Sequence, residues 1–150
     1  MSLATRTAAK TLFVTLALVA TVAVAKEGVQ DPTVKARMDL MSQQGKAMGV
    51  LGGMAQGKTP FDAAAAAAAR ETLIATGADI AAKFETEADD PVSEATPQIW
   101  LMFDDFSAKA EAMTAAATAM DVSSLDAVKA GMGAVGGTCQ ACHSEYRAKR

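Results

Sequence analysis

Apolar and small residues recur at steps of three and four along two long stretches of this chain, with polar residues between them. They are Val34, Met38, Met41, Gly45, Met48 and Gly52 in the first stretch, and Ile99, Met102, Phe103, Phe106, Ala110 and Met113 in the second. This spacing is typical of helices that bury one face. A third stretch, 60–85, is rich in alanine, which favours helix and permits close approach of a neighbour. The pattern predicts helices packed against one another.

Helix starts are marked by N-cap and proline pairs and by side chains spaced for capping. The pairs are Asp31-Pro32, Thr59-Pro60 and Thr96-Pro97, and the capping spacings are Thr59 with Asp62 and Ser123 with Asp126. These starts predict four helices, over 32–54, 60–85, 97–119 and 123–148. The segment 85–95 is acidic and contains a proline, so we expect a solvated loop. The expected fold class is all-α, an antiparallel four-helix bundle.

The first 25 residues have the layout of a secretory signal peptide. Arg6 and Lys10 precede an uncharged apolar run, and Ala23-Val24-Ala25 offers small residues for cleavage. The run is short for a span of about 20 residues, which disfavours the alternative of an uncleaved membrane anchor. We therefore expect residues 1–25 to be removed, residues 26–150 to form one domain, and the product to reside in the periplasm without stable membrane insertion.

Removal of that segment makes the chain more acidic. Two of the 14 basic residues lie in it and none of the 17 acidic ones, so 12 basic residues remain and the formal net charge falls from −3 to −5. An acidic exported protein is a poor candidate for binding nucleic acid or an anionic membrane. Its surface charge instead predicts a basic or neutral partner protein, with binding that weakens as salt rises.

Both cysteines and the only histidine lie within five consecutive residues, as Cys139, Cys142 and His143. On a helix, positions i, i+3 and i+4 share one face. Two thiols so placed can each add to a haem vinyl group while the neighbouring imidazole binds iron, and C-x-x-C-H is typical of c-type haem attachment. We therefore expect one haem c, covalently held near the C-terminus by Cys139 and Cys142, with His143 as an axial iron ligand.

Other uses of these three side chains are weaker. A disulfide between Cys139 and Cys142 would close a very small loop and stabilise little. A thioredoxin-like redox pair needs a βαβ setting that the pattern lacks. A zinc site needs four ligands, so a carboxylate would have to complete the three available here. A helical bundle that binds another metal, or serves a structural role without haem, remains the alternative from a different class.

Glycine is unusually frequent just before this motif, at Gly131, Gly133, Gly136 and Gly137. Each glycine in a helix costs about 0.5–1 kcal/mol relative to alanine. Two explanations are open. Either the helix is frayed or kinked there, or a flat macrocycle or the first helix lies against the glycine backbone.

Three segments, taken in order, resemble the class II cytochromes c, the cytochrome c′ family. They are "RMDLM" at 37–41, "TPQIW" at 96–100 followed by Phe106, and "CQACHSEYR" at 139–147. The resemblance covers essentially the whole chain after the signal segment. It implies a four-helix bundle with one covalent haem c near one end, often as a homodimer, in the bacterial periplasm.

The resemblance also implies roles for individual residues. Arg37 is expected to meet a haem propionate, and Arg147 to lie near the outer face of the His143 imidazole or over the haem edge. Met41 occupies the position of the family's distal side chain, and Met38 lies one turn earlier.

The function expected from this arrangement is that of a one-electron carrier, because no acid–base machinery of an enzyme stands out. Only seven residues follow His143 and none is methionine, so a sixth iron ligand has to come from earlier in the chain, with Met41 as the candidate. If the Met41 sulfur binds iron, the haem is six-coordinate and suited to electron transfer with a periplasmic redox partner. If Met41 only packs over the iron, the haem is five-coordinate and the site can admit nitric oxide or carbon monoxide.

Overall fold

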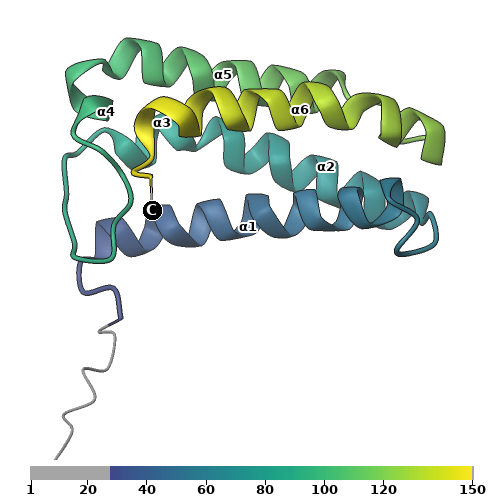
Figure 1. Cartoon of the computed structure of the whole chain (residues 1–150), viewed down its shortest axis with the longest axis horizontal. Coiled ribbons are helices and arrows are strands. Elements are labelled where there is room, and N and C mark those ends of the chain that lie inside the picture. Colours follow the sequence, from purple (N-terminus) through teal and green to yellow (C-terminus); the bar gives the residue numbers. More distant parts are fainter. Residues whose placement is uncertain (1–27, 150) are drawn as a thin grey trace, which may run out of the picture.

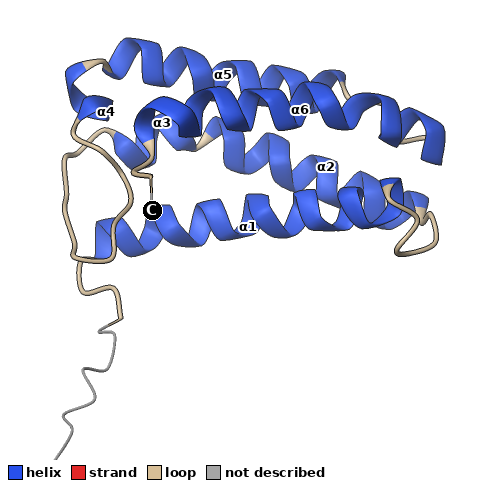
Figure 2. Cartoon of the chain, in the orientation of Figure 1, coloured by secondary structure: helices blue, strands red, loops and turns tan. Residues whose placement is uncertain are grey.

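The computed structural model describes residues 28–149, and this part of the chain forms six helices (Figures 1 and 2). They are α1 (Pro32–Ala55), α2 (Ala63–Ala78), α3 (Ile80–Phe84), α4 (Gln98–Leu101), α5 (Phe103–Ala119) and α6 (Leu125–Tyr146). The described residues contain no strand; the one extended pairing is an isolated antiparallel bridge between Ala95 and Arg147. The signal segment expected at 1–25 lies outside the described residues and stays a prediction.

Four long helices lie side by side and alternate in direction. Helix α1 packs against α2 and α6, and α5 packs against the same two helices from the opposite side (Figure 1). The short helix α3 follows α2 with a break at Asp79, and α4 precedes α5 with a break at Met102. The predicted all-α four-helix bundle is therefore confirmed. Within residues 28–149, no helix is both long enough and apolar enough to span a bilayer.

The observed caps can be compared with the predicted ones at the starts of α1, α2 and α6. The Asp31 carboxylate accepts hydrogen bonds from the backbone of Thr33 and Val34, at 2.7 and 2.9 Å, as expected for the cap of α1. The predicted start at Thr59-Pro60 is wrong, because the Asp62 side chain is itself the cap and α2 begins at Ala63. Helix α6 is likewise capped by Ser124, one residue after the predicted Ser123.

Two helices predicted as continuous are each interrupted, the one at 60–85 by the break at Asp79 and the one at 97–119 by the break at Met102. The predicted helix 97–119 divides into α4 and α5 because Met102 adopts φ −131° and ψ 46°, outside the helical region. Thr96 does not cap α4 with its side chain. Its backbone N–H and its hydroxyl both point to the carbonyl oxygen of Tyr146, at 3.0 and 3.3 Å. The start of α4 is thus tied to the end of α6, which carries the C-x-x-C-H motif.

The buried face of α1 is rotated from the one that the sequence predicts. The buried residues of α1 are Val34, Arg37, Leu40, Gln44, Ala47, Leu51, Gly52 and Met54. Met38 is 44% exposed and Gly45 is exposed, whereas Met41 and Met48 are partly buried at the edge of the core. The face predicted from the methionine stripe, Met38, Met41 and Met48, was wrong in part, because two polar residues, Arg37 and Gln44, occupy core positions.

The buried face of α5 agrees better with its prediction. Phe106, Ala110 and Met113 are all buried, and so is Ile99 on α4. Met102, expected on the same face, is 46% exposed because it lies at the break between α4 and α5.

Candidate haem-attachment site

Helix α6 runs without interruption through the C-x-x-C-H motif to Tyr146, so the cysteines and the histidine share one face. All three line the same small cavity of about 30 Å³. The cysteines are free and half-buried, and no disulfide joins them. The single patch expected from the i, i+3, i+4 spacing is therefore present in the folded chain.

The rest of the cavity wall comes from three other helices. Met41 and Gln44 line it from α1, Ile80 from α3, and Lys109, Ala110 and Met113 from α5, with Thr138 adjoining the motif on α6. Met41 and His143 thus line one cavity from two packed helices, although 102 positions separate them in the chain. Met38 is not among the lining residues, and its contact with a haem stays a prediction.

Partial burial shifts the pKa values of the three motif side chains away from their ionised forms. It raises the pKa of Cys142 to about 11 and raises the pKa of Cys139 as well. It lowers the pKa of His143, and the positive charge of Arg147 lowers it further. At neutral pH the thiols are therefore protonated and the imidazole is neutral, which is the form of histidine that binds a metal.

Arg37 is buried under the acidic loop rather than at the cavity wall. Its side chain is 3% exposed, and its Nε donates to the carbonyl oxygen of Lys83 at 2.9 Å. The terminal nitrogens donate to the carbonyl oxygens of Ala88, at 3.2 Å, and of Thr86. The guanidinium also lies over the rings of Phe84 and Trp100, 4.8 and 5.3 Å from their centroids.

These contacts make Arg37 a brace between α1 and the segment 83–88. Burial lowers the pKa of its guanidinium, although arginine stays charged at any ordinary pH. The propionate contact implied by the family resemblance stays a prediction, since the contacts of Arg37 in this structure are to backbone carbonyls.

Arg147 lies at the end of α6 and pairs with the loop before α4. Its Nε and Nη2 both lie 2.5 Å from the Glu94 Oε2. Its backbone N–H donates to the His143 carbonyl at 3.3 Å and closes the last turn of the helix. The positive charge of Arg147 lowers the pKa of the His143 imidazole. The contact of Arg147 with a haem stays a prediction.

The comparisons with known proteins agree with this site. The family model described as Cytochrome C′ matches residues 32–147, nearly the whole described part of the chain. The chain belongs to the cytochrome c′ family. Cytochrome c-556 of Agrobacterium tumefaciens (strain apple 185) is 39% identical over 120 residues, covering 77% of this chain and 94% of that protein.

Two solved structures show the same fold. The model of oxidized cytochrome c556 from R. palustris has a TM-score of 0.73 at 28% identity, covering 81% of this chain and 99% of the other. A nitric oxide complex of a variant of cytochrome c prime from Alcaligenes xylosoxidans has a TM-score of 0.68 at 31% identity, with coverage of 78% and 94%. Similar proteins therefore include both c-556 and c′ types.

Membership of this family assigns the cofactor, one covalently bound haem c. The donor set of this cytochrome fits that group, because two thiols and a neutral imidazole share a face and a thioether sulfur lies across the cavity. Cys139 and Cys142 would hold the haem through thioether bonds, and His143 would bind its iron. The bound group supplies reversible one-electron chemistry at iron.

The alternatives to haem attachment lose support. The described residues contain no strand, so the βαβ setting of a thioredoxin-like pair is missing from them. In the same part of the chain, no three His, Cys, Asp or Glu side chains converge to hold a metal ion. The relatives are cytochromes c, and no enzymatic activity is indicated for this family member.

Of the explanations open for the glycines before the motif, contact with a macrocycle stays a prediction, and the structure bears only on the others. An added Cβ at Gly133, Gly136 or Gly137 meets nothing within 4 Å, so the first helix does not press on them. At Gly131 a Cβ would lie 2.7 Å from the Cγ of Met120, which belongs to the connection after α5. The frayed-helix explanation is also wrong, since α6 is continuous here.

Sequence reasoning missed Gln44 and Lys109 as cavity residues. Lys109 Nζ lies 3.5 Å from carboxylate oxygens of Asp105 and Glu145, so its charge is paired at the cavity wall. Gln44 follows Met41 by three positions, and that spacing on one helix face was the available signal. Gln44 was not predicted at the cavity because a polar residue in an amphipathic pattern is normally assigned to the solvent-exposed face of the helix.

Proposed function

We propose that this protein is a periplasmic one-electron carrier whose single haem iron is bound by His143 and by the sulfur of Met41. One observation carries the proposal, namely that Met41 and His143 line the same cavity from α1 and α6. Methionine and histidine together favour a low-spin iron with a raised reduction potential, which suits electron transfer. The relatives are named both cytochrome c-556 and cytochrome c′, so their support extends to a single-haem cytochrome.

Met113 is a second sulfur at the cavity, and its packing argues against it as the ligand. It is 4% exposed on α5, and its terminal methyl lies so close to Gly77 that a Cβ there would be 2.7 Å away. Met113 is thus held against α2 by its far end. Met41 is only partly buried at the edge of the core, so less packing is lost when its sulfur turns toward iron.

The test compares three methionine substitutions in the haem-loaded protein. Met41→Leu should abolish the ferric methionine–iron charge-transfer band at the red end of the visible spectrum and lower the reduction potential. Met38→Leu, one turn away and 44% exposed, and Met113→Leu are the controls, and both should keep the band. Wild-type protein without that band would contradict the proposal, and loss of the band in Met113→Leu alone would transfer the ligand role to Met113.

A second candidate function is binding of nitric oxide or carbon monoxide at a five-coordinate iron. Its support is that variants of a structurally similar cytochrome c prime form nitric oxide complexes. The two functions differ in one rapid measurement. Untreated ferrous protein with Met41 bound should take up carbon monoxide slowly, because the sulfur must first leave, whereas a vacant site should bind it at once.

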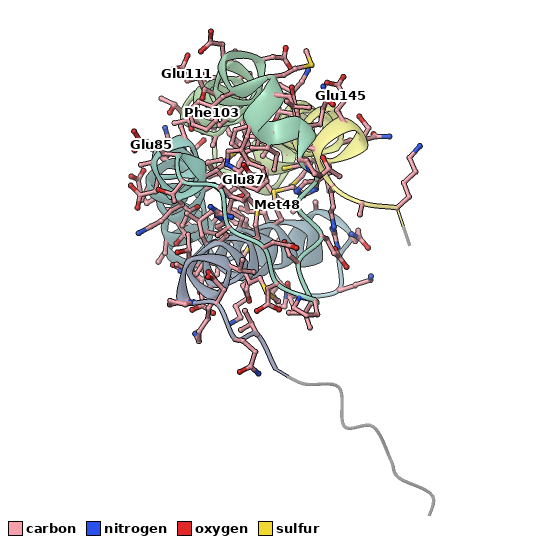
Figure 3. All side chains as sticks on the ribbon, turned by 90° about the vertical axis from the view of Figure 1, so that its left-hand side faces the viewer. Met48, Glu85, Glu87, Phe103, Glu111 and Glu145 are labelled. Carbon is pink, nitrogen blue, oxygen red and sulfur yellow. The ribbon has the colours of Figure 1, made fainter. Side chains whose placement is uncertain are left out.

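The cellular location and the partner belong to the same proposal. The signal segment at 1–25 supports export to the periplasm, and cell fractionation with N-terminal sequencing tests it. Exposed carboxylates of Glu85 and Glu145 lie at the end of the bundle that carries α4, and the exposed carboxylate of Glu111 projects from the middle of α5 (Figure 3). They support a basic or neutral redox partner, and a reduction rate that does not fall with rising salt would contradict this part. A homodimer is tested by sedimentation.

A further inference from the structure

One buried polar group in the bundle is not explained by the fold. The side chain of Gln44 is 9% exposed, and its Nε2 has no hydrogen-bond partner among the described residues. A buried amide N–H left unpaired costs about as much as a lost hydrogen bond, so such groups are rare in folded proteins. A partner that completes the site is therefore expected.

Apart from the C-x-x-C-H side chains, the cavity wall has two further polar side chains, Thr138 and Lys109, and both already have hydrogen-bond or ion-pair partners. The Thr138 hydroxyl donates to the carbonyl oxygen of Val135 at 2.7 Å. The Lys109 ammonium group lies between Asp105 and Glu145. Apart from the C-x-x-C-H side chains, only Gln44 brings a donor without a partner to this wall of the described structure.

The position of Gln44 on α1 limits what that donor can reach. Gln44 follows Met41 by three residues, so the two side chains are neighbours on one helix face. Both line the cavity from α1, whereas His143 lines it from α6. The amide therefore lies with Met41, on the wall formed by the helix that does not carry His143.

We propose that Gln44 is a positioning residue whose side-chain N–H donates a hydrogen bond to the group that occupies the sixth coordination position of the haem iron. Under the proposed function that group is the Met41 thioether, which can accept a weak hydrogen bond. The inference rests on the proposed function for the identity of this acceptor. Gln44 then holds the Met41 sulfur in place and makes its displacement harder.

The experiment compares Gln44→Leu with Gln43→Leu in haem-loaded protein. Gln43 is the adjacent, exposed residue of α1 and serves as the matched control. Gln44→Leu should keep the ferric charge-transfer band but make displacement of Met41 by added imidazole roughly three- to tenfold easier, the range expected for one lost hydrogen bond. It should also shift the reduction potential, whereas Gln43→Leu should change neither. Gln44→Ala removes the same amide with less volume and replaces Gln44→Leu if that variant fails to take up haem.

The outcomes separate failure of this inference from failure of the proposed function. If wild-type protein has the band and Gln44→Leu behaves like Gln43→Leu, the hydrogen bond to Met41 is overturned while electron transfer stands. If wild-type protein lacks the band, the proposed function fails, and the donor then faces an exogenous ligand. In that case Gln44→Leu should shift the C–O stretching frequency of the ferrous carbon monoxide complex, and an unchanged frequency overturns the inference.

Discussion

The Tyr146 hydroxyl donates a 2.5 Å hydrogen bond to the Asp105 carboxylate, which joins the last residue of α6 to the first turn of α5. The ring of Tyr146 also packs edge-on against Phe106, with centroids 5.3 Å apart. Tyr146 lies three residues after His143, so this pair fixes the turn of α6 that presents the imidazole. Polar and aromatic contacts outside the cavity thus position His143, the proposed iron ligand, within it.

Replacing Tyr146 with phenylalanine should reduce stability in a pH-dependent way. The hydrogen bond from Tyr146 lowers the pKa of Asp105, so its contribution is present above the unfolded value of about 4 and is lost as pH falls through the folded value. Burial, together with Asp105, raises the pKa of Tyr146 to about 12, so this contribution is present below about pH 10 and is lost as pH rises toward 12.

We therefore expect the thermal midpoints of wild-type and Tyr146→Phe proteins to differ most between about pH 5 and 9 and to converge at both extremes. Asp105→Asn tests the other partner, and Asp104→Asn, the exposed neighbour, is its control. A difference that stays constant from acid to alkali would show that the ring packing matters and the hydrogen bond does not.

Arg37→Lys should destabilise the protein by about 2–4 kcal/mol. Lysine cannot reproduce the three hydrogen bonds that the planar guanidinium makes to the segment 83–88, and a buried carbonyl that loses a charged donor is costly. Urea denaturation measures the free energy of unfolding. Lys35→Arg, on the exposed face of the same helix, should change it by less than about 0.5 kcal/mol. If Arg37→Lys alters the haem spectrum with no loss of stability, the propionate contact is the main role of Arg37.

Two glycines should respond in opposite ways to alanine. At Gly77 an added Cβ would lie 2.5 Å from the Thr114 Oγ1, a stiff side chain already bonded to the Ala110 carbonyl, so Gly77→Ala should lower the free energy of unfolding by about 1–3 kcal/mol. At Gly133 the Cβ meets nothing within 4 Å, so Gly133→Ala should raise it by about 0.5–1 kcal/mol through helix propensity. A lower free energy of unfolding for Gly133→Ala would instead indicate that the bound haem lies against this face of α6.

The two cysteines should hold the haem independently. Cys139→Ser and Cys142→Ser should each keep haem that resists extraction by acidified acetone, because one thioether remains, whereas the double variant should release all of it. Gln140→Ser, an exposed position between them, controls for the effect of serine on the helix. Complete retention in the double variant would refute thioether attachment through this pair.

Much of this molecule follows from local sequence. The patch of Cys139, Cys142 and His143 depends only on helix periodicity, and α6 is a helix capped by a serine. Haem attachment could therefore be predicted without knowledge of how the helices pack. The cap at Asp31 is equally local, since the carboxylate bonds to backbone two and three residues ahead. Boundaries at Asp62 and Ser124 were shifted because several residues at each start can cap, and the fold selects one.

What the tertiary structure decided is which side of α1 faces inward. The methionine stripe predicted one face, but Arg37 is drawn into the core by carbonyl oxygens 46 or more residues later in the chain and by two aromatic rings. That rotation brings Gln44 to the cavity beside Met41 and leaves Met38 exposed. Periodicity specifies that a helix has a buried face, whereas the partners that satisfy its polar residues come from distant segments, and only their arrangement in space fixes the face.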